Sequence, residues 1–396
     1  MSTGIYAGNL QRSGEYQTRG LRTLQGVRWS YQAQGHIHFP PLVAHGRVYV
    51  GSNDGSFYAL DTHTEALQWR FETASTSLPV EKDDRMNAWK YTGVTSVQLT
   101  RSTAFFGTAN GTIYRLDLET GQPTWQFLEE QSEEIFHVIV VDDLLLFWSK
   151  SGISAVNVTT KERLWEGRLH ISYGEPICCP TIADRMLYCA SIVGHNGDIL
   201  LQAYDFSTKE LVWQSNVDGP YDYIPAIEGF VPVVNGTAYF VAGVFGADND
   251  TNGEEEVDDD ESTCLVAVDA LTGKLQWFYE IGDWTGTENG YTALANNLAC
   301  VVKESGDIFA IDLTTHKARW TRQLDGGGSE KWYDIPSSLA DGILYLPRRD
   351  GLLTALDALT GQDLWTVQLD GEITTPCTIA DGVVYVAAGA SVYALH

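Results

Sequence analysis

One eleven-residue pattern recurs seven times in this chain of 396 residues, and it restricts the fold more than any other feature. The third position is an acid or its amide, the sixth is Thr and the eleventh is Trp. The copies read ALDTHTEALQW at 59–69, RLDLETGQPTW at 115–125, AVNVTTKERLW at 155–165, AYDFSTKELVW at 203–213, AVDALTGKLQW at 267–277, AIDLTTHKARW at 310–320 and ALDALTGQDLW at 355–365. Self-similarity of this kind indicates stacked supersecondary units rather than one irregular core.

Each copy predicts the outer half of a small antiparallel sheet. The alternating run before the acid, such as SFYALD at 56–61, has the period of a strand. The acid and Thr then favour a tight turn, and the strand that carries Trp follows. Upstream, pairs such as His45-Gly46 and Asp381-Gly382 favour two-residue hairpin turns. The unit is a four-stranded sheet, and because it cannot cover its own apolar faces, radial stacking is expected.

Eight units are expected, and the two chain ends supply one of them jointly. The last unit stops at YALH (393–396) without a Trp strand, whereas VRWSY (27–31) looks like a Trp strand with no unit before it. Pairing the two closes the ring and removes an exposed sheet edge. The prediction is an all-β, eight-bladed β-propeller of four-stranded antiparallel blades over residues 27–396, preceded by a lead-in at 1–26.

The repeat resembles the PQQ-type (pyrroloquinoline quinone) propeller repeats of quinoprotein alcohol dehydrogenases and of the outer-membrane assembly lipoprotein BamB. Their docking pattern A-x-D-x-x-x-G-x-x-x-W is matched in full at 267–277 and 355–365, and less fully elsewhere. The resemblance covers about residues 27–396 and implies the propeller fold. It does not choose between an enzyme and a scaffold, because this fold carries both.

Variation in length falls on one face of the predicted ring. If strands A to D run from centre to rim, the D–A and B–C connections share one face, the loop face. The A–B and C–D turns share the other, the turn face, where two-residue A–B turns are expected throughout. The D–A segments after Trp69 and Trp213 are long, and a B–C connection holds an acidic insertion at about 246–263. Long loops in compact domains tend to be functional, and neutral drift is the alternative.

Charge restricts the partners. The chain has 52 Asp and Glu against 25 Lys and Arg, a net charge of −27. Such a surface repels phosphate backbones and anionic membranes, so nucleic acid is not an expected partner and a cationic or neutral ligand is favoured. No membrane span is expected. Because the N-terminus lacks a signal-peptide core, the chain as written is expected in the cytoplasm, or in the periplasm or outside the cell if a signal peptide has been removed.

Aromatic side chains outside the repeat gather in segments of the loop face. Exposed aromatic residues at a concave surface indicate ligand or partner binding. The other interpretation is that they pack beneath the long loops. With one cation and one amide they form the predicted ligand-binding set: Arg85, Trp89, Tyr223, Trp284, Asn289, Trp332 and Tyr333.

One position per blade is expected to line the mouth of the central channel. The residue seven positions before the A–B turn is polar in five blades, and three of these residues are His38, Glu228 and Asp334. A histidine with two carboxylates around a funnel could perform acid–base chemistry, so these are the candidate catalytic residues. A water-filled channel lining is the alternative. The deepest pocket is expected to open on this face.

The acidic insertion contains a candidate metal site. The segment 248–261 reads DNDTNGEEEVDDDE, which places Asp248, Asp250, Asn252 and Glu256 in the spacing of a calcium loop. Asp259 stands where EF-hand loops carry Glu, and a solvated acidic insertion is the other interpretation. Calcium is therefore the candidate cofactor.

Two adjacent cysteines offer a weaker link to quinone chemistry. Cys178-Cys179 is similar to the vicinal disulfide above the quinone in methanol-dehydrogenase-type enzymes. The acid, asparagine and aspartate of their site have no matching motif in this chain, so bound PQQ is not expected, and the cysteines fit a strand equally well.

Three functions follow from these patterns. The first is a propeller that binds a small molecule or peptide in an aromatic and acidic funnel on the loop face, with or without catalysis. The second is a scaffold for protein–protein interaction, as the resemblance to the assembly lipoprotein implies. The third is a quinoprotein dehydrogenase.

Overall fold

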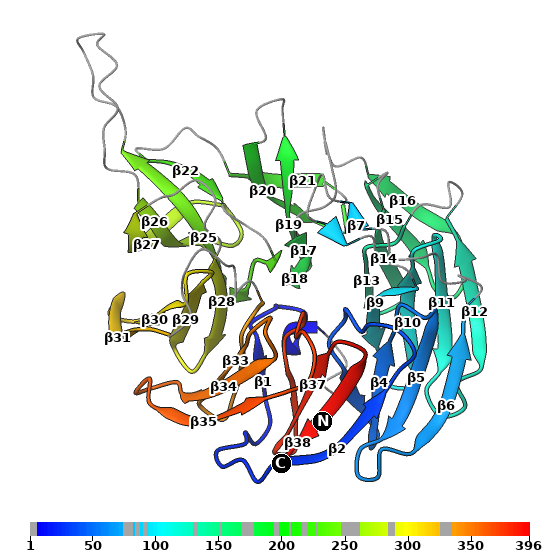
Figure 1. The fold of residues 1–396 in the computed structure, drawn as a ribbon. Coiled ribbons are helices and arrows are strands. Elements are labelled where there is room, and N and C mark those ends of the chain that lie inside the picture. Colours follow the sequence, from blue (N-terminus) through cyan, green and yellow to red (C-terminus); the bar gives the residue numbers. More distant parts are fainter. Residues whose placement is uncertain are drawn as a thin grey trace.

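The chain is described by a computed structural model over residues 6–73, 82–83, 88–89, 93–129, 134–149, 152–167, 178–193, 198–205, 207–208, 210–215, 221–225, 229–246, 262–283, 290–324 and 335–396. Figure 1 shows the strands arranged as blades around a central axis. The described strands form eight such blades, so the predicted all-β, eight-bladed β-propeller is confirmed.

Within each blade the four strands of the repeat run antiparallel from the centre to the rim, and β1 (Glu15–Tyr16), added to blade 7, pairs in parallel with its neighbour. Blade 1 contains β3 (Leu42–Ala44), β4 (Arg47–Gly51), β5 (Ser56–Asp61) and β6 (Leu67–Glu72). Blade 2 contains β9 (Val94–Leu99), β10 (Thr103–Thr108), β11 (Thr112–Asp117) and β12 (Pro123–Leu128). Blade 3 contains β13 (His137–Val141), β14 (Leu144–Ser149), β15 (Gly152–Asn157) and β16 (Arg163–Gly167). Blade 4 contains β18 (Thr181–Ala183), β19 (Met186–Val193), β20 (Asp198–Asp205) and β21 (Glu210–Gln214).

The second half of the ring follows the same order, with two additions. Blade 5 contains β22 (Tyr221–Pro225) and β24 (Val233–Val234), both paired with β25 (Thr237–Gly246), then β26 (Ser262–Asp269) and β27 (Leu275–Asp283). Blade 6 contains β28 (Gly290–Ala295), β29 (Leu298–Lys303), β30 (Asp307–Asp312) and β31 (Lys317–Gln323). Blade 7 contains β1 (Glu15–Tyr16), β32 (Ser338–Ala340), β33 (Ile343–Pro347), β34 (Leu352–Asp357) and β35 (Asp363–Gln368).

Blade 8 joins the two ends of the chain. It contains β36 (Thr378–Ala380), β37 (Val383–Ala388), β38 (Ser391–Leu395) and, at the rim, β2 (Val27–Gln32). Trp29 lies opposite Ala394 in this antiparallel pair and is buried, and its indole Nε1 donates to the carbonyl of Thr62 in blade 1. The predicted closure of the ring by the N-terminal strand is therefore confirmed.

The hairpin turns at the turn face explain much of the local sequence. In seven blades the A–B turn has two residues, and the first of them has a positive φ, as at Asn235 (52°) and Asp381 (51°). Asn, Asp and Gly tolerate this left-handed backbone better than other residues, which is why they recur there. Blade 2 differs from the prediction of two-residue turns throughout: three residues, 100–102, join β9 to β10.

The repeat Trp packs against the next blade, as Trp213 shows. Trp213 of blade 4 donates its Nε1 hydrogen bond, 2.9 Å, to the carbonyl of Ala270, the residue after the repeat acid of blade 5. The indole ring of Trp213 covers Gly273. An added Cβ at Gly273 would lie 2.6 Å from this indole, and the φ of Gly273 is +70°. The Gly of the docking pattern is thus required by both a positive φ and a close approach.

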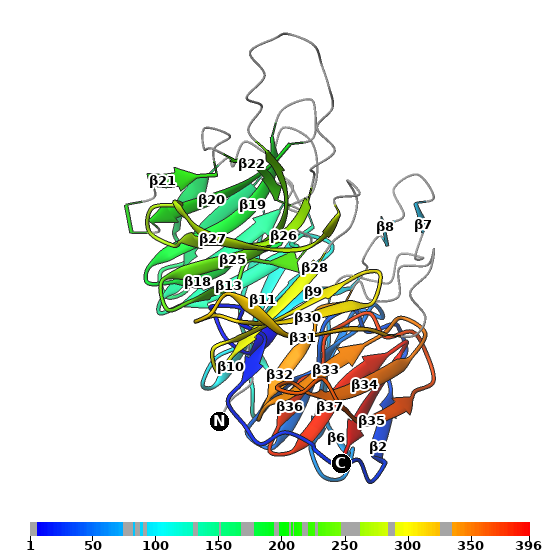
Figure 2. The same ribbon diagram turned by 90° about the vertical axis from the view of Figure 1, so that its left-hand side faces the viewer.

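The segment before β2 does more than lead into the propeller. Residues 9–21, here called the N-terminal strap, cross the turn face and accept one backbone hydrogen bond from each of blades 4 to 8. The donor N–H groups belong to Ile182, Val233, Leu294, Leu339 and Gly382. Figure 2 shows β1 and the N-terminus on the opposite side of the ring from the short hairpin of β7 (Lys82–Asp83) and β8 (Ala88–Trp89).

The strap also replaces a missing repeat turn. Blade 8 has no repeat acid, so Trp365 of blade 7 lacks the carbonyl that Trp29, Trp69, Trp213 and Trp320 use. Its Nε1 donates instead to the carbonyl of Leu21, at 2.7 Å, while the N–H of Leu21 donates to the hydroxyl of Tyr345. The strap therefore completes the last docking contact in the ring.

The repeat acids make the fold sensitive to low pH. Hydrogen bonds from the following backbone N–H groups and hydroxyls lower the pKa of Asp61, Asp117, Asp205, Asp269 and Asp312. For Asp312 the backbone of Thr315 and the side chain of Arg319 lower the pKa from 3.8 to about 2. Because these values lie below those of the unfolded chain, the carboxylates stabilise the fold above about pH 4, and that contribution is lost as pH falls toward 2.

We therefore expect the melting temperature to fall steeply between pH 4 and pH 2, with a shallower fall in Asp312→Asn. Blade 3 offers a matched test, because Asn157 holds the repeat acid's place and accepts the same two backbone hydrogen bonds through Oδ1. Asn157→Asp should steepen the fall, since it adds a carboxylate with a lowered pKa. Equal pH profiles in all three proteins, measured by scanning calorimetry, would contradict this assignment.

Candidate binding site at the loop face

Four polar side chains meet at the loop face where blades 7, 8 and 1 join, and we call them the mouth cluster: His36, His38, Arg349 and Glu372. The two imidazoles are stacked, with ring centroids 5.8 Å apart and an interplanar angle of 10°. Arg349 Nη1 lies 2.8 Å from Glu372 Oε1, and these side chains are 35% and 39% exposed. The cluster therefore combines two rings with one ion pair that remains open to solvent.

Three separate stretches of chain hold the mouth cluster in place. His36 and His38 follow β2, Arg349 lies in the B–C turn of blade 7, and Glu372 lies between blades 7 and 8. The N–H of Ile37 donates to the carbonyl of Gly389 at 2.9 Å, and the N–H of Gly389 donates to the carbonyl of Glu372 at 2.8 Å. The N–H of Leu369, before Glu372, also donates to the carbonyl of Gly351 in the turn of Arg349, at 2.9 Å, so backbone hydrogen bonds link all three stretches.

Burial and neighbouring charge keep His38 neutral. Desolvation, with smaller effects of His36 and Arg349, lowers the pKa of His38 from 6.5 to about 4. At neutral pH its imidazole can therefore donate one hydrogen bond and accept another. It cannot act as a general acid, because that role needs the protonated imidazolium. Of the roles that the sequence suggested for His38, hydrogen bonding or action as a base fits this state.

Most of the other predicted site residues lie outside the described part of the chain. Tyr223 belongs to β22 and Trp89 to β8, whose backbones are described without their side chains. The candidate ligand-binding and catalytic residues that lie outside the described residues are Arg85, Glu228, Trp284, Asn289, Trp332, Tyr333 and Asp334. Their roles stay predictions, and His38 is the predicted residue that the structure places in a polar cluster.

The metal and cysteine hypotheses likewise stay open. Asp248, Asp250, Asn252 and Glu256 lie outside the described residues, between β25 and β26, so the calcium site stays a prediction. Within the described ranges, His, Cys, Asp and Glu form no group of three or more that could hold a metal ion. The backbone of Cys178-Cys179 forms β17, which pairs in parallel with β23 (Gly229–Phe230).

A cavity among the described residues opens on the turn face, while the prediction that the deepest pocket lies on the loop face stays open, because most of the predicted lining residues lie outside the described part of the chain. The turn-face cavity measures about 760 Å³ and is lined by the strap together with the A–B turns of blades 4, 5 and 6. The strap forms one wall of this cavity, across turns that would otherwise form an open surface.

Sequence reasoning missed Arg349 and Glu372, although a signal for them was present. The register count compared only the first residues of strand A, and Arg349 lies in a B–C turn. The turn reads Arg348-Arg349-Asp350, a pair of cations in a chain with a net charge of −27. Two adjacent cations in a chain with excess acidic residues were the sequence signal that indicated a polar site at this turn.

Comparison with protein families decides the relationship that the repeat suggested. A family model described as outer membrane protein assembly factor BamB matches residues 25–177, 109–334 and 328–396. The chain belongs to this family. It is thus a PQQ-like repeat propeller related to BamB and to quinoprotein dehydrogenases, and no helix in its described residues is long and apolar enough to cross a membrane.

Two relatives represent these two branches of PQQ-like propellers. Outer membrane protein assembly factor BamB of Burkholderia pseudomallei is 24% identical over 191 residues, which are 48% of this chain and 47% of the relative. Polyvinylalcohol dehydrogenase of a Sphingopyxis species is 22% identical over an alignment of length 378 that covers 85% of this chain and 52% of the relative. The chain spans about half the length of the relatives it matches.

Solved structures of both branches share the fold. BamB from Moraxella catarrhalis superposes with a TM-score of 0.65 at 15% identity, covering 94% of this PQQ-like propeller and 100% of that chain. Quinohemoprotein alcohol dehydrogenase from Comamonas testosteroni superposes with a TM-score of 0.68 at 14% identity, covering 100% of this chain and 80% of that chain. At these identities the likeness concerns the fold alone.

Proposed function

We propose that this propeller binds an extended peptide segment of a partner protein at its loop face, and that the mouth cluster supplies the polar contacts. The observation that carries the proposal is the convergence of three stretches of chain on His36, His38, Arg349 and Glu372 under backbone hydrogen bonds. Polar groups that are held in place before binding lose less conformational entropy when a ligand arrives.

The chemistry of the mouth cluster suits a peptide backbone. A neutral imidazole at His38 offers one donor and one acceptor, and the paired Arg349 and Glu372 offer further donors and acceptors. An extended peptide presents N–H and C=O groups in alternation, which such a set can meet. The net charge of −27 favours a neutral or basic peptide over an acidic one.

The aromatic and acidic funnel of the sequence analysis is the wider site in this proposal. Trp89, Trp284 and Trp332 would supply apolar walls, and Glu228 and Asp334 would supply negative charge. Membership in a family described by an assembly factor supports a protein as the source of the ligand. The ligand-binding and scaffold hypotheses then merge into one, in which a segment of the partner occupies the funnel.

A quinoprotein dehydrogenase is the second candidate, favoured by the match to polyvinylalcohol dehydrogenase over 85% of the chain. A bound quinone and its calcium ion need a set of oxygen donors from the protein. The described residues contain no group of three or more such acids, and most of the predicted loop-face residues lie outside them, so this cofactor stays untested and we derive no redox step.

The proposal is tested with peptides selected from a random phage-displayed library against the immobilised full chain. The best synthetic peptide should bind, and His38→Ala or Arg349→Ala should each weaken binding roughly tenfold or more, the effect of losing a contact worth about 1.4 kcal/mol. Isothermal titration calorimetry measures the change. Trp284→Ala and Trp332→Ala, measured with the same peptide, test the aromatic walls.

Arg322→Ala is the matched control, because Arg322 also forms an ion pair, with Asp363, but lies on a rim strand. It should leave peptide affinity unchanged. The proposal is wrong if the library yields no binding peptide, or if the mouth variants and the rim variant bind alike.

A further inference from the structure

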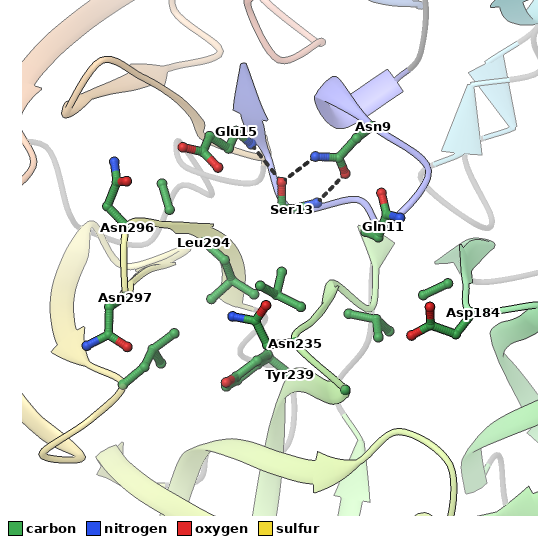
Figure 3. A pocket seen from close by; sticks show the side chains of 16 residues that line it. Asn9, Gln11, Ser13, Glu15, Asp184, Asn235, Tyr239, Leu294, Asn296 and Asn297 are labelled. Atoms are coloured by element: carbon green, nitrogen blue, oxygen red, sulfur yellow. Dashed lines mark hydrogen bonds between the residues drawn. The ribbon is translucent and has the colours of Figure 1, made fainter. Parts of the chain in front are cut away.

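A polar cavity lies on the turn face, away from the mouth cluster. The strap forms one side of it through Asn9, Gln11 and Ser13, and Asn235 and Tyr239 of blade 5 lie across from them in Figure 3. Its volume, about 760 Å³, falls within the usual range for small-molecule sites, roughly 300–1,000 Å³.

The strap wall of this cavity is held rigidly. The carbonyls of Leu10, Gln11 and Ser13 accept backbone hydrogen bonds from blades 4, 5 and 6. Asn9 and Ser13 are joined by two more: Nδ2 of Asn9 donates to the Ser13 hydroxyl at 2.7 Å, and the N–H of Ser13 donates to Oδ1 of Asn9 at 3.1 Å. A wall fixed at both ends keeps the cavity open without a ligand.

The lining is rich in uncharged amides. Gln11, Asn235 and Asn296 line this space, and within the described part of the chain their side chains form no hydrogen bond. The left-handed turn position in blades 5 and 6 does not demand an amide, because Asp fills it in blades 7 and 8, at Asp341 and Asp381. The turn geometry therefore leaves the choice of Asn unexplained.

The remaining lining residues set the charge and shape of the ligand. Glu15 and Asp184 are the two carboxylates, and the described lining contains no Lys or Arg, which disfavours an anion. Apolar contact comes from Val233, Leu294 and Tyr239, all buried. Amides and carboxylates beside an apolar floor match a ring that bears hydroxyls at its edge and C–H groups on its face.

We propose that this cavity binds an uncharged polyhydroxylated ligand of the saccharide class. Each amide can donate to one hydroxyl and accept from a neighbouring one, and each carboxylate can accept from two hydroxyls at once. The apolar floor contacts the C–H face of the sugar ring, and the strap supplies one wall of the site.

The test uses the full chain and three uncharged trisaccharides, maltotriose, cellotriose and raffinose, in saturation-transfer NMR and calorimetric titration. At least one should bind. In the double variant Asn235→Gly/Asn296→Gly, binding should weaken about tenfold or more, because two side-chain hydrogen bonds are lost. Gly keeps the positive φ of both turns, so the backbone should remain in place.

Asp381→Gly is the matched control, since it makes the same kind of change at the equivalent turn of blade 8, outside this cavity. It should bind the trisaccharide as the wild type does, and so should Arg349→Ala, which separates this site from the peptide site. The proposal is overturned if none of the three sugars binds, if the double variant binds normally, or if spermidine displaces the sugar and binds more tightly.

Discussion

Deleting residues 1–31 is expected to lower the melting temperature by about 10 °C or more, or to leave the protein aggregated. The deletion removes most of β2, so β38 loses its partner, and it removes Trp29, whose burial between blades is worth about 3–5 kcal/mol. It also removes all strap hydrogen bonds to blades 4 to 8. An unpaired edge at β38 would in addition favour association between molecules.

Two shorter deletions separate the contributions. Removing residues 1–6 leaves the strap hydrogen bonds and β2 in place and should change the melting temperature little. Removing residues 1–25 takes away the strap but keeps β2, and should fall between the other two. If the deletion of 1–31 melts like the wild type, neither the closing strand nor the strap stabilises the ring.

Trp213→Ala is expected to cost about 3–5 kcal/mol in the free energy of unfolding. Its side chain is 8% exposed, packs against Tyr188 at a centroid distance of 6.2 Å and covers Gly273. The substitution opens a cavity between blades 4 and 5 and leaves the carbonyl of Ala270 without the indole donor. Urea denaturation measures the loss.

A graded series tests the docking role of this Trp. Trp213→Phe keeps an aromatic ring but removes the Nε1 donor, and should lose roughly 1–2 kcal/mol. Leu271→Ala alters a nearby side chain that is 59% exposed, and should stay within about 0.5 kcal/mol of the wild type. Equal unfolding free energies for Trp213→Ala and Leu271→Ala would contradict the proposed role of the repeat Trp.

The blades and their closure could be predicted from sequence because the repeat ties local pattern to contact. The acid and Thr specify a turn, and the Trp eight residues after the acid contacts the next blade. The same spacing therefore predicts both the strand that carries Trp and the blade that this Trp contacts. Trp29 fits the Trp strand of the repeat although no repeat unit precedes it. This observation indicated where the two ends of the chain close the ring.

The strap could not be predicted in this way. Many of its contacts with the blades use backbone carbonyls, as at Leu10, Gln11 and Leu21, and a backbone carbonyl leaves no signature in the choice of side chain. The cavity on the turn face depends on the strap, so no sequence pattern indicated it.

The mouth cluster was predictable only in part. Counting back from the A–B turns found His38, because that count assigns one equivalent position to each blade. Arg349 and Glu372 join it from a B–C turn and from a segment between blades, where no common register applies. Their meeting follows from the closure of the ring, which places blades 7, 8 and 1 side by side.

Amide hydrogen exchange of the full chain, with and without the selected peptide, tests the central claim most directly. The account predicts slower exchange with peptide at residues 36–39, 348–351 and 372–374, around the mouth cluster, and unchanged exchange at 233–239 and 294–297. Protection confined to the second set of residues would place the peptide on the turn face and contradict binding at the loop face.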